Sequence, residues 1–150
     1  MLTETSPCRI VLAEDNPADV RLVREALREN KVNCELRVLT DGEEVVSFIT
    51  SLDLDSKHPC PDLLLLDMHL PKRDGKEVLK HLRASARCAR TRVVVLTSSD
   101  APSDHQSAEK NAAIHYFRKP SNLEQFMHLG QIVKDVLGGP TSQQSQTEQQ

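Results

Sequence analysis

The sequence predicts a single α/β domain whose five-stranded parallel sheet is covered by helices on both faces. Three observations lead to this fold class. Short apolar runs alternate with segments of helical periodicity, which is the pattern of successive β–α units. Two of these runs, Leu63–Leu66 and Val93–Leu96, contain no polar residue, as expected for strands buried on both faces. The length of 150 residues suits one domain, and no internal repeat is visible.

The first half of the chain predicts strand, helix, strand and helix in turn. Consecutive apolar residues place strands at 9–14 and 35–39. Asn16-Pro17 supplies an N-cap and a first helical residue, and apolar positions at helical spacing continue to about residue 30. The second helix follows Asp41, which forms a capping box with Glu44, and its inward face carries Val45, Phe48, Ile49 and Leu52.

The second half continues the alternation. Strands at 62–67 and 92–97 hold the two runs without polar residues, and Asp74-Gly75 leads into a helix at 76–83. The remaining elements before the last helix are a polar, weakly patterned helix at 103–113 and a short strand at 114–118.

The last helix begins at a capping box of Ser121 and Glu124 and ends at Gly138-Gly139-Pro140. No apolar residue follows Pro140, so the end of the chain cannot bury a core face and is expected to be disordered. We therefore expect three regions, which are an N-terminal segment (1–8), the folded domain (9–137) and a polar tail (138–150).

Composition excludes several classes of function. The net charge of −3 offers no basic footprint for nucleic acid, and no apolar run is long enough to span a membrane. The six histidines lack the spacing of a zinc site. No secretory signal precedes the four widely spaced cysteines, Cys8, Cys34, Cys60 and Cys88, so we expect reduced thiols in a cytoplasmic protein.

Polar side chains follow four of the predicted strands at the point where each strand ends. Ligands of an open parallel sheet gather at the carboxyl ends of its strands. Each of these residues alone would be an ordinary turn, cap or surface residue. Together they predict one site, made of Glu14, Asp15, Asp67, Thr97 and Lys119.

The chemistry of this set is restrictive. Three carboxylates close together repel one another and call for a cation, and oxygen ligands suit Mg²⁺. A hydroxyl (Thr97) and an ammonium (Lys119) that face a metal-bound carboxylate can hold a phosphoryl group, whose charge is spread over equatorial oxygens in the transition state. Asp67 would then be the nucleophile that forms an acyl phosphate.

The same residues, with their neighbours, resemble the signature of the response-regulator receiver domain over about residues 9–137. The motifs that carry the resemblance are Glu14-Asp15, the stretch Leu66-Asp67-Met68-His69-Leu70-Pro71, Asp74-Gly75, Thr97-Ser98 and Lys119-Pro120. The resemblance implies a flavodoxin-like sheet with strand order 2-1-3-4-5. It also implies no enzymatic activity beyond Mg²⁺-assisted self-phosphorylation and autodephosphorylation.

The resemblance assigns roles residue by residue. It makes Asp67 the phosphoacceptor and Thr97 and Lys119 the pair that holds the phosphoryl oxygens. The metal ligands would be Asp15 and Asp67 directly, Glu14 through water, and the backbone carbonyl of His69. Tyr116 would be an aromatic switch residue, although a simple core role competes with this interpretation.

A narrower resemblance is to the stand-alone regulators that are paired with bacterial phytochromes. It rests on Asn16-Pro17-Ala18-Asp19, the polar loop before Pro61-Asp62, the stretch 70–79 and Lys119-Pro120-Ser121-Asn122-Leu123. It implies a sensor histidine kinase, a bacteriophytochrome or a similar hybrid sensor, as phosphoryl donor. The alternative is a phosphorelay intermediate that passes the group to a histidine phosphotransfer protein.

The output would be a protein contact or a change in a dimer. The last helix has more apolar positions than one core-facing stripe requires. This predicts a homodimer through that helix and the neighbouring surface, with a well-buried helix in a monomer as the alternative. The residues assigned to the dimer or output face are Phe126, Leu129, Val133 and Val136.

Two rival functions share parts of this pattern. A dehalogenase-type phosphatase also uses a strand-end Asp with Mg²⁺, but it needs a second acid two residues on, where this chain has His69. A flavodoxin-like cofactor binder needs a Ser/Thr/Gly-rich phosphate loop after the first strand. The acids of Glu14-Asp15-Asn16-Pro17 would repel a phosphate there.

Overall fold

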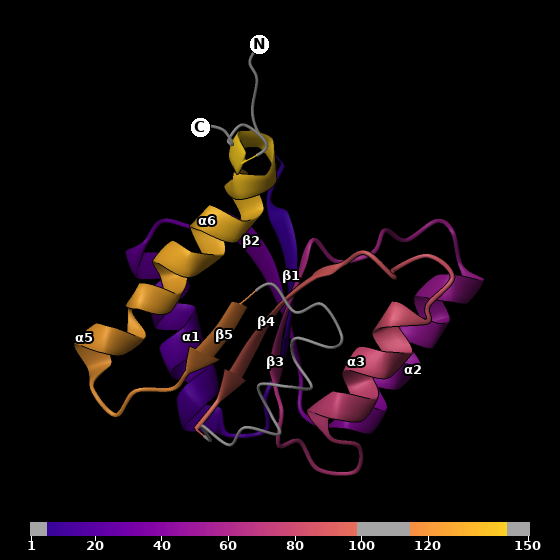
Figure 1. Ribbon diagram of the computed structural model, residues 1–150, viewed down its shortest axis with the longest axis horizontal. Helices are drawn as coiled ribbons and strands as arrows, with labels where there is room; N and C mark the ends of the chain where they lie inside the picture. Colours follow the sequence, from indigo (N-terminus) through magenta and orange to yellow (C-terminus); the bar gives the residue numbers. More distant parts are fainter. Residues whose placement is uncertain (1–5, 99–114, 144–150) are drawn as a thin grey trace.

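The computed structural model describes residues 6–98 and 115–143, in which five parallel strands form one sheet (Figure 1). The strand order β2-β1-β3-β4-β5 confirms the predicted fold class and topology. The strands are β1 (Cys8–Ala13), β2 (Cys34–Leu39), β3 (Leu63–Asp67), β4 (Arg92–Thr97) and β5 (His115–Arg118). The described helices are α1 (Pro17–Glu29), α2 (Gly42–Leu54), α3 (Gly75–Arg83), α5 (Leu123–Phe126) and α6 (His128–Gln143). The helix predicted at 103–113 lies outside the described residues.

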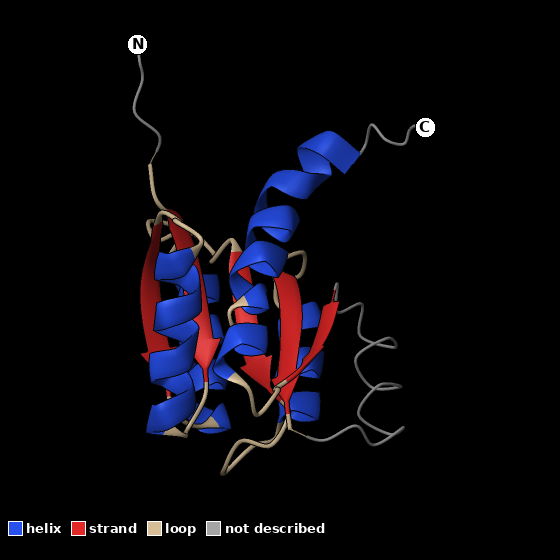
Figure 2. Ribbon diagram, turned by 90° about the vertical axis from the view of Figure 1, so that its left-hand side faces the viewer, coloured by secondary structure: helices blue, strands red, loops and turns tan. Residues whose placement is uncertain are grey.

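Helices cover both faces of the sheet, with α2 and α3 on one face and α1, α5 and α6 on the other (Figures 1 and 2). Successive residues of a strand point to opposite faces, so each central strand supplies both cores. Leu64 of β3 packs in the core under α2 and α3, whereas Leu65 packs in the core under α1 and α6. This double burial explains why the strand sequences are continuously apolar.

The predicted helix starts are largely confirmed. Asn16 caps α1, since its Oδ1 accepts a hydrogen bond from the Ala18 N–H at 2.9 Å. Asp41 caps α2 and accepts from the Glu44 N–H, while the Glu44 carboxylate reaches back to the Thr40 N–H. The contacts of Asn16 and Asp41 satisfy backbone donors that a helix leaves unpaired at its start.

The last helix departs from the prediction at both ends. Asn122, not Ser121, is the N-cap, and it caps the short helix α5; α6 follows from His128. The predicted stop at Gly138-Gly139-Pro140 is wrong, because α6 runs on to Gln143 and projects past the sheet in Figure 2. The stop was predicted because Gly and Pro disfavour a helix by about 1 and 3 kcal/mol. The φ angle of proline is nevertheless compatible with a helix, and α6 continues through Pro140. Residues 144–150 lie outside the described part of the chain.

The prediction of four reduced thiols is wrong for two of them. Cys60 and Cys88 form a disulfide with a Cα–Cα distance of 5.5 Å, whereas Cys8 and Cys34 are free. The segments that precede β3 and β4 are held together by Asp53, which accepts from Ser85 Oγ, and by Arg87, which donates to backbone carbonyls of residues 52, 55 and 58. Sequence spacing gives no sign of this approach.

The cytoplasmic location stays a prediction. Among the residues that the structure describes, no helix combines the length and apolar character needed to cross a bilayer.

The loop after β3 is fitted closely against the start of α2. The Gly42 N–H donates to the Pro71 carbonyl at 3.1 Å, and a Cβ added at Gly42 would lie 1.8 Å from the Arg73 carbonyl oxygen. We expect Gly42→Ala to lower the free energy of unfolding by about 2 kcal/mol, because backbone would have to move. Urea unfolding measures this loss.

Gly138→Ala is the matched control, because a Cβ there meets nothing within 4 Å. Its stability should be unchanged or higher by up to about 1 kcal/mol, as alanine is the better helix former. Equal unfolding midpoints for the two variants would contradict this account of the loop.

Candidate functional site

The predicted site residues meet at the carboxyl ends of four strands. Glu14 directly follows β1, Asp67 ends β3, Thr97 ends β4 and Lys119 directly follows β5. Backbone hydrogen bonds fix these positions, since the Glu14 N–H donates to the Leu39 carbonyl and the Lys119 N–H to the Thr97 carbonyl. Glu14 and Thr97 are fully buried and Asp67 is 6% exposed, so the site lies within the edge of the sheet.

Lys119 is the centre of the site. Its Nζ donates to Glu14 Oε1 at 2.6 Å, to Asp19 Oδ2 at 2.8 Å and to Asp67 Oδ2 at 3.0 Å. An ammonium group has three N–H donors, so each donor has one carboxylate. The predicted convergence of Glu14, Asp67 and Lys119 is thus present in the geometry.

Asp19 is a member of this network that was not among the predicted site residues. It lies in the first turn of α1, and this turn begins at the same edge of the sheet because α1 directly follows β1. The sequence could have indicated Asp19 as a site residue. It follows Glu14 by five residues, and a side chain in the first turn of a helix that directly follows a strand lies near the end of that strand.

Three carboxylates form a cluster that suits a hard cation. Oxygen atoms of Glu14, Asp15 and Asp67 lie within 4.8 Å of one another. Glu14 and Asp67 are buried, whereas Asp15 is exposed, so an ion could enter from the Asp15 side. An all-oxygen set with an open side, on which an ion can keep waters, fits Mg²⁺.

Electrostatics in the cluster reflect burial and the crowding of negative charge. The pKa of Glu14 is raised to about 7, chiefly by burial; the hydrogen bond from Lys119 opposes this shift, and the charge of Asp67 adds to it. For Lys119, burial by itself lowers the pKa, but hydrogen bonds to Asp19 and Glu14 and the charge of Asp67 raise the pKa above its usual value overall. Lys119 is therefore a permanent cation in this site.

The remaining predicted residues surround the cluster. The His69 backbone N–H donates to Asp67 Oδ1 at 2.9 Å, which leaves Oδ2 of Asp67 for Lys119. The His69 residue itself is exposed. Thr97 is buried beside the site at the end of β4. Tyr116, on β5, is partly buried and packs against the core under α2 and α3. It therefore contributes to this core, as the alternative interpretation of Tyr116 expects.

The residues assigned to a dimer face do not lie on the surface, so this assignment is wrong. All four are buried against α1 and the sheet in the domain's own core, because their spacing is that of a core-facing helix stripe. They are Phe126, Leu129, Val133 and Val136.

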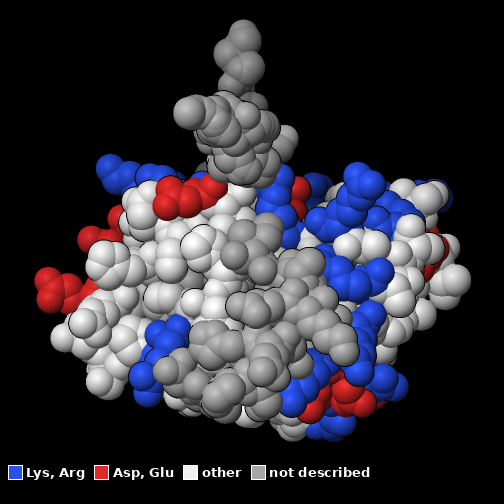
Figure 3. All heavy atoms as spheres, viewed as in Figure 1, with Lys and Arg blue, Asp and Glu red and all other residues white. Residues whose placement is uncertain are grey.

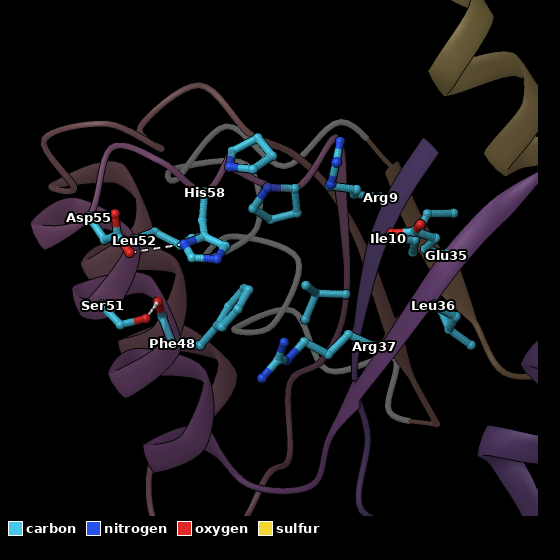
Figure 4. A pocket seen from close by; sticks show the side chains of 13 residues that line it. Arg9, Ile10, Glu35, Leu36, Arg37, Phe48, Ser51, Leu52, Asp55 and His58 are labelled. Carbon is cyan, nitrogen blue, oxygen red and sulfur yellow. Dashed lines mark hydrogen bonds and ion pairs between the residues drawn. The ribbon is translucent and has the colours of Figure 1, made fainter. Parts of the chain in front are cut away.

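A basic surface and a cavity are further features of the described residues, and the cavity is separate from the cluster. Lys and Arg side chains gather over α3 in Figure 3. A cavity of about 580 Å³ lies between α2 and the strands β1 and β2, where the guanidinium of Arg37 stands 4.7 Å from the centroid of the Phe48 ring (Figure 4). Its lining contains none of Glu14, Asp67 and Lys119.

Comparison with known proteins gives a consistent result. Residues 10–130 match the family model described as the response regulator receiver domain. Response regulator Rcp1 of Synechocystis sp. is 35% identical over 135 residues, which are 89% of this chain and 92% of Rcp1.

Solved structures with the same fold include those of two response regulators. The phosphorylated cyanobacterial phytochrome response regulator RcpA superposes with a TM-score of 0.79 at 32% identity, over 90% of this chain and 96% of RcpA. The Mn²⁺-bound form of Rcp1 superposes with a TM-score of 0.75 at 35% identity, over 86% of this chain and 93% of the Rcp1 structure.

Proposed function

Since the chain belongs to the response regulator receiver domain family, we propose that it receives a phosphoryl group on Asp67 from a sensor histidine kinase. The observation that carries this proposal is the position of Asp67 Oδ2, 3.0 Å from the Lys119 ammonium and within the acidic cluster. A nucleophilic carboxylate next to a fixed cation is what transfer of an anionic group requires. The phosphorylated state of RcpA supports it.

The transfer would be a direct displacement. An Asp67 carboxylate oxygen attacks the phosphorus of a phosphohistidine, the new O–P bond forms as the P–N bond breaks, and the leaving nitrogen keeps the electron pair and takes a proton from solvent. The N–H of Lys119 that now points at Asp67 can turn to a phosphoryl oxygen, and the Thr97 hydroxyl would hold another.

The proposed metal ligands are Asp15 and Asp67, with Glu14 through water and the His69 carbonyl. When bound, Mg²⁺ would neutralise charge on the phosphoryl oxygens. The Mn²⁺-bound form of Rcp1 supports binding of a divalent cation, and the all-oxygen donor set supports this cluster as its place.

We propose that the chain works as a stand-alone regulator paired with a bacteriophytochrome. The support is the coverage of Rcp1 and RcpA over nearly their full lengths and the description of RcpA as a phytochrome response regulator.

The output of this chain would pass through protein contacts in which Tyr116 changes position. Because the apolar stripe of α5 and α6 is buried, a homodimer through this region would use the neighbouring surface, where Leu123 of α5 is 59% exposed. Sedimentation as a monomer at high concentration would exclude the dimer.

Transfer from a labelled kinase tests the proposed function. A bacteriophytochrome kinase that has phosphorylated itself with labelled ATP should lose label to this chain when Mg²⁺ is present. An excess of EDTA should stop the transfer, because the acidic cluster then lacks its cation. Equal transfer with EDTA would contradict the metal-dependent mechanism. No transfer from this kinase, with labelling by acetyl phosphate intact, would reject only the phytochrome pairing.

A further inference from the structure

The three carboxylates around Lys119 are not equivalent. Glu14 and Asp67 belong to the acidic cluster that suits a divalent cation, whereas Asp19 is not among its members. Asp19 comes from the first turn of α1, and its side chain is 20% exposed, against 0% for Glu14 and 8% for Asp67. Asp19 is thus the acceptor of Lys119 that a metal ion would leave unchanged.

A cation in the cluster changes what Lys119 requires. The carboxylates of Glu14 and Asp67 would then interact with the ion as well as with Lys119. The Lys119 ammonium would also lie close to the positive charge of the ion. At an effective dielectric constant near 20, a single and a double positive charge about 5 Å apart repel by about 7 kcal/mol before nearby carboxylates offset it. A carboxylate that accepts from Lys119 but lies outside the cluster, as Asp19 does, reduces this cost.

We propose that Asp19 is a positioning residue that holds the Lys119 ammonium while a divalent cation occupies the acidic cluster. This inference rests on the proposed function, because it assumes that the cluster binds the cation. Without metal, Lys119 has two other carboxylates, so Asp19 contributes little. With metal, Asp19 is the one acceptor whose full charge remains available to Lys119 among the described residues.

Asp19→Asn keeps the shape of the side chain and removes its charge. We expect this variant to bind Mn²⁺ about tenfold more weakly than the original chain, since the ammonium then faces the ion without its counter-charge. Binding is measured by titration with Mn²⁺ while the electron paramagnetic resonance signal of the free ion is followed. In urea, the metal-free variant should lose only the small stability that one favourable charge at a helix start provides.

Glu77→Gln is the matched control. Glu77 also lies in the first turn of a helix, α3, so this variant loses the same favourable charge at a helix start without touching Lys119. Its Mn²⁺ affinity should stay unchanged. Asp19→Glu, which keeps the charge, should regain part of the lost affinity.

A double-mutant cycle separates positioning from plain attraction of the ion. If Asp19 acts through Lys119, adding Asp19→Asn to Lys119→Met should change Mn²⁺ affinity less than twofold. An undiminished tenfold loss in that background would overturn the positioning role. An Asp19→Asn variant that binds Mn²⁺ as tightly as the original chain would also overturn the positioning role. If acetyl phosphate still labels Asp67 in that case, the proposed function stands without this inference. A chain that neither binds Mn²⁺ nor accepts a phosphoryl group would overturn both.

Discussion

Lys119→Met is expected to destabilise the metal-free protein by about 3 kcal/mol, because it leaves buried carboxylates without their cation. The Lys119 side chain is 10% exposed, and Glu14 and Asp67 are at least as buried. Adding Mg²⁺ should restore much of this stability, since the ion then supplies the missing positive charge and binds the folded state. Urea unfolding in EDTA and in Mg²⁺ measures both effects.

The control for this experiment is another lysine paired with an acid. Lys72 lies 3.5 Å from Asp41, but its side chain is 67% exposed, and exposed pairs contribute about 0–1 kcal/mol. Lys72→Met should therefore have nearly the original midpoint in both buffers. If Lys119→Met were as stable as Lys72→Met in EDTA, Lys119 would not be the charge that holds the cluster together.

Asp67→Asn is expected to abolish phosphoryl acceptance and leave the fold intact. The amide oxygen can still accept from the His69 N–H, which now donates to Asp67 Oδ1, so the turn after β3 is kept. An amide is a poor nucleophile and a weaker metal ligand than a carboxylate. We therefore expect Mn²⁺ affinity to fall at least about tenfold as well, measured by the same titration of the free ion.

The parallel strands and the main site residues could be predicted because each depends on local pattern plus one rule of topology, whereas the strand order was implied by the family resemblance. Runs such as Leu63–Leu66 mark buried strands, and the carboxyl ends of parallel strands must meet at one edge. This is enough to bring Glu14, Asp67 and Lys119 together without any knowledge of distances.

The contacts that escaped prediction depend on how separate segments approach one another. Asp19 meets Lys119 only after α1 folds back over the sheet edge, and Cys60 meets Cys88 only when two loops come together. The choice of Asn122 over Ser121 as N-cap depends on backbone geometry, because both residues are good caps. None of these is encoded in a single periodicity.

The apolar stripe of α5 and α6 was recognised correctly from the sequence, but its assignment to a dimer face was wrong. The spacing of Phe126, Leu129 and Val133 identified an apolar helix face, but a sequence does not say whether such a face meets the chain's own core or another molecule. The structure places it against α1 and the sheet. The surplus of apolar residues is taken up by Met127, Ile132 and Leu137, which are partly buried against the same core.

The most direct test of Asp67 as acceptor is incubation with acetyl phosphate and Mg²⁺, followed by intact mass. The account predicts one added phosphoryl group on the original chain and none on Asp67→Asn. Asp62→Asn is the control, because Asp62 flanks the opposite end of β3 and accepts from the Arg9 N–H; it should be labelled fully. Equal labelling of Asp67→Asn and the original chain, or no labelling of the original chain, would contradict the account.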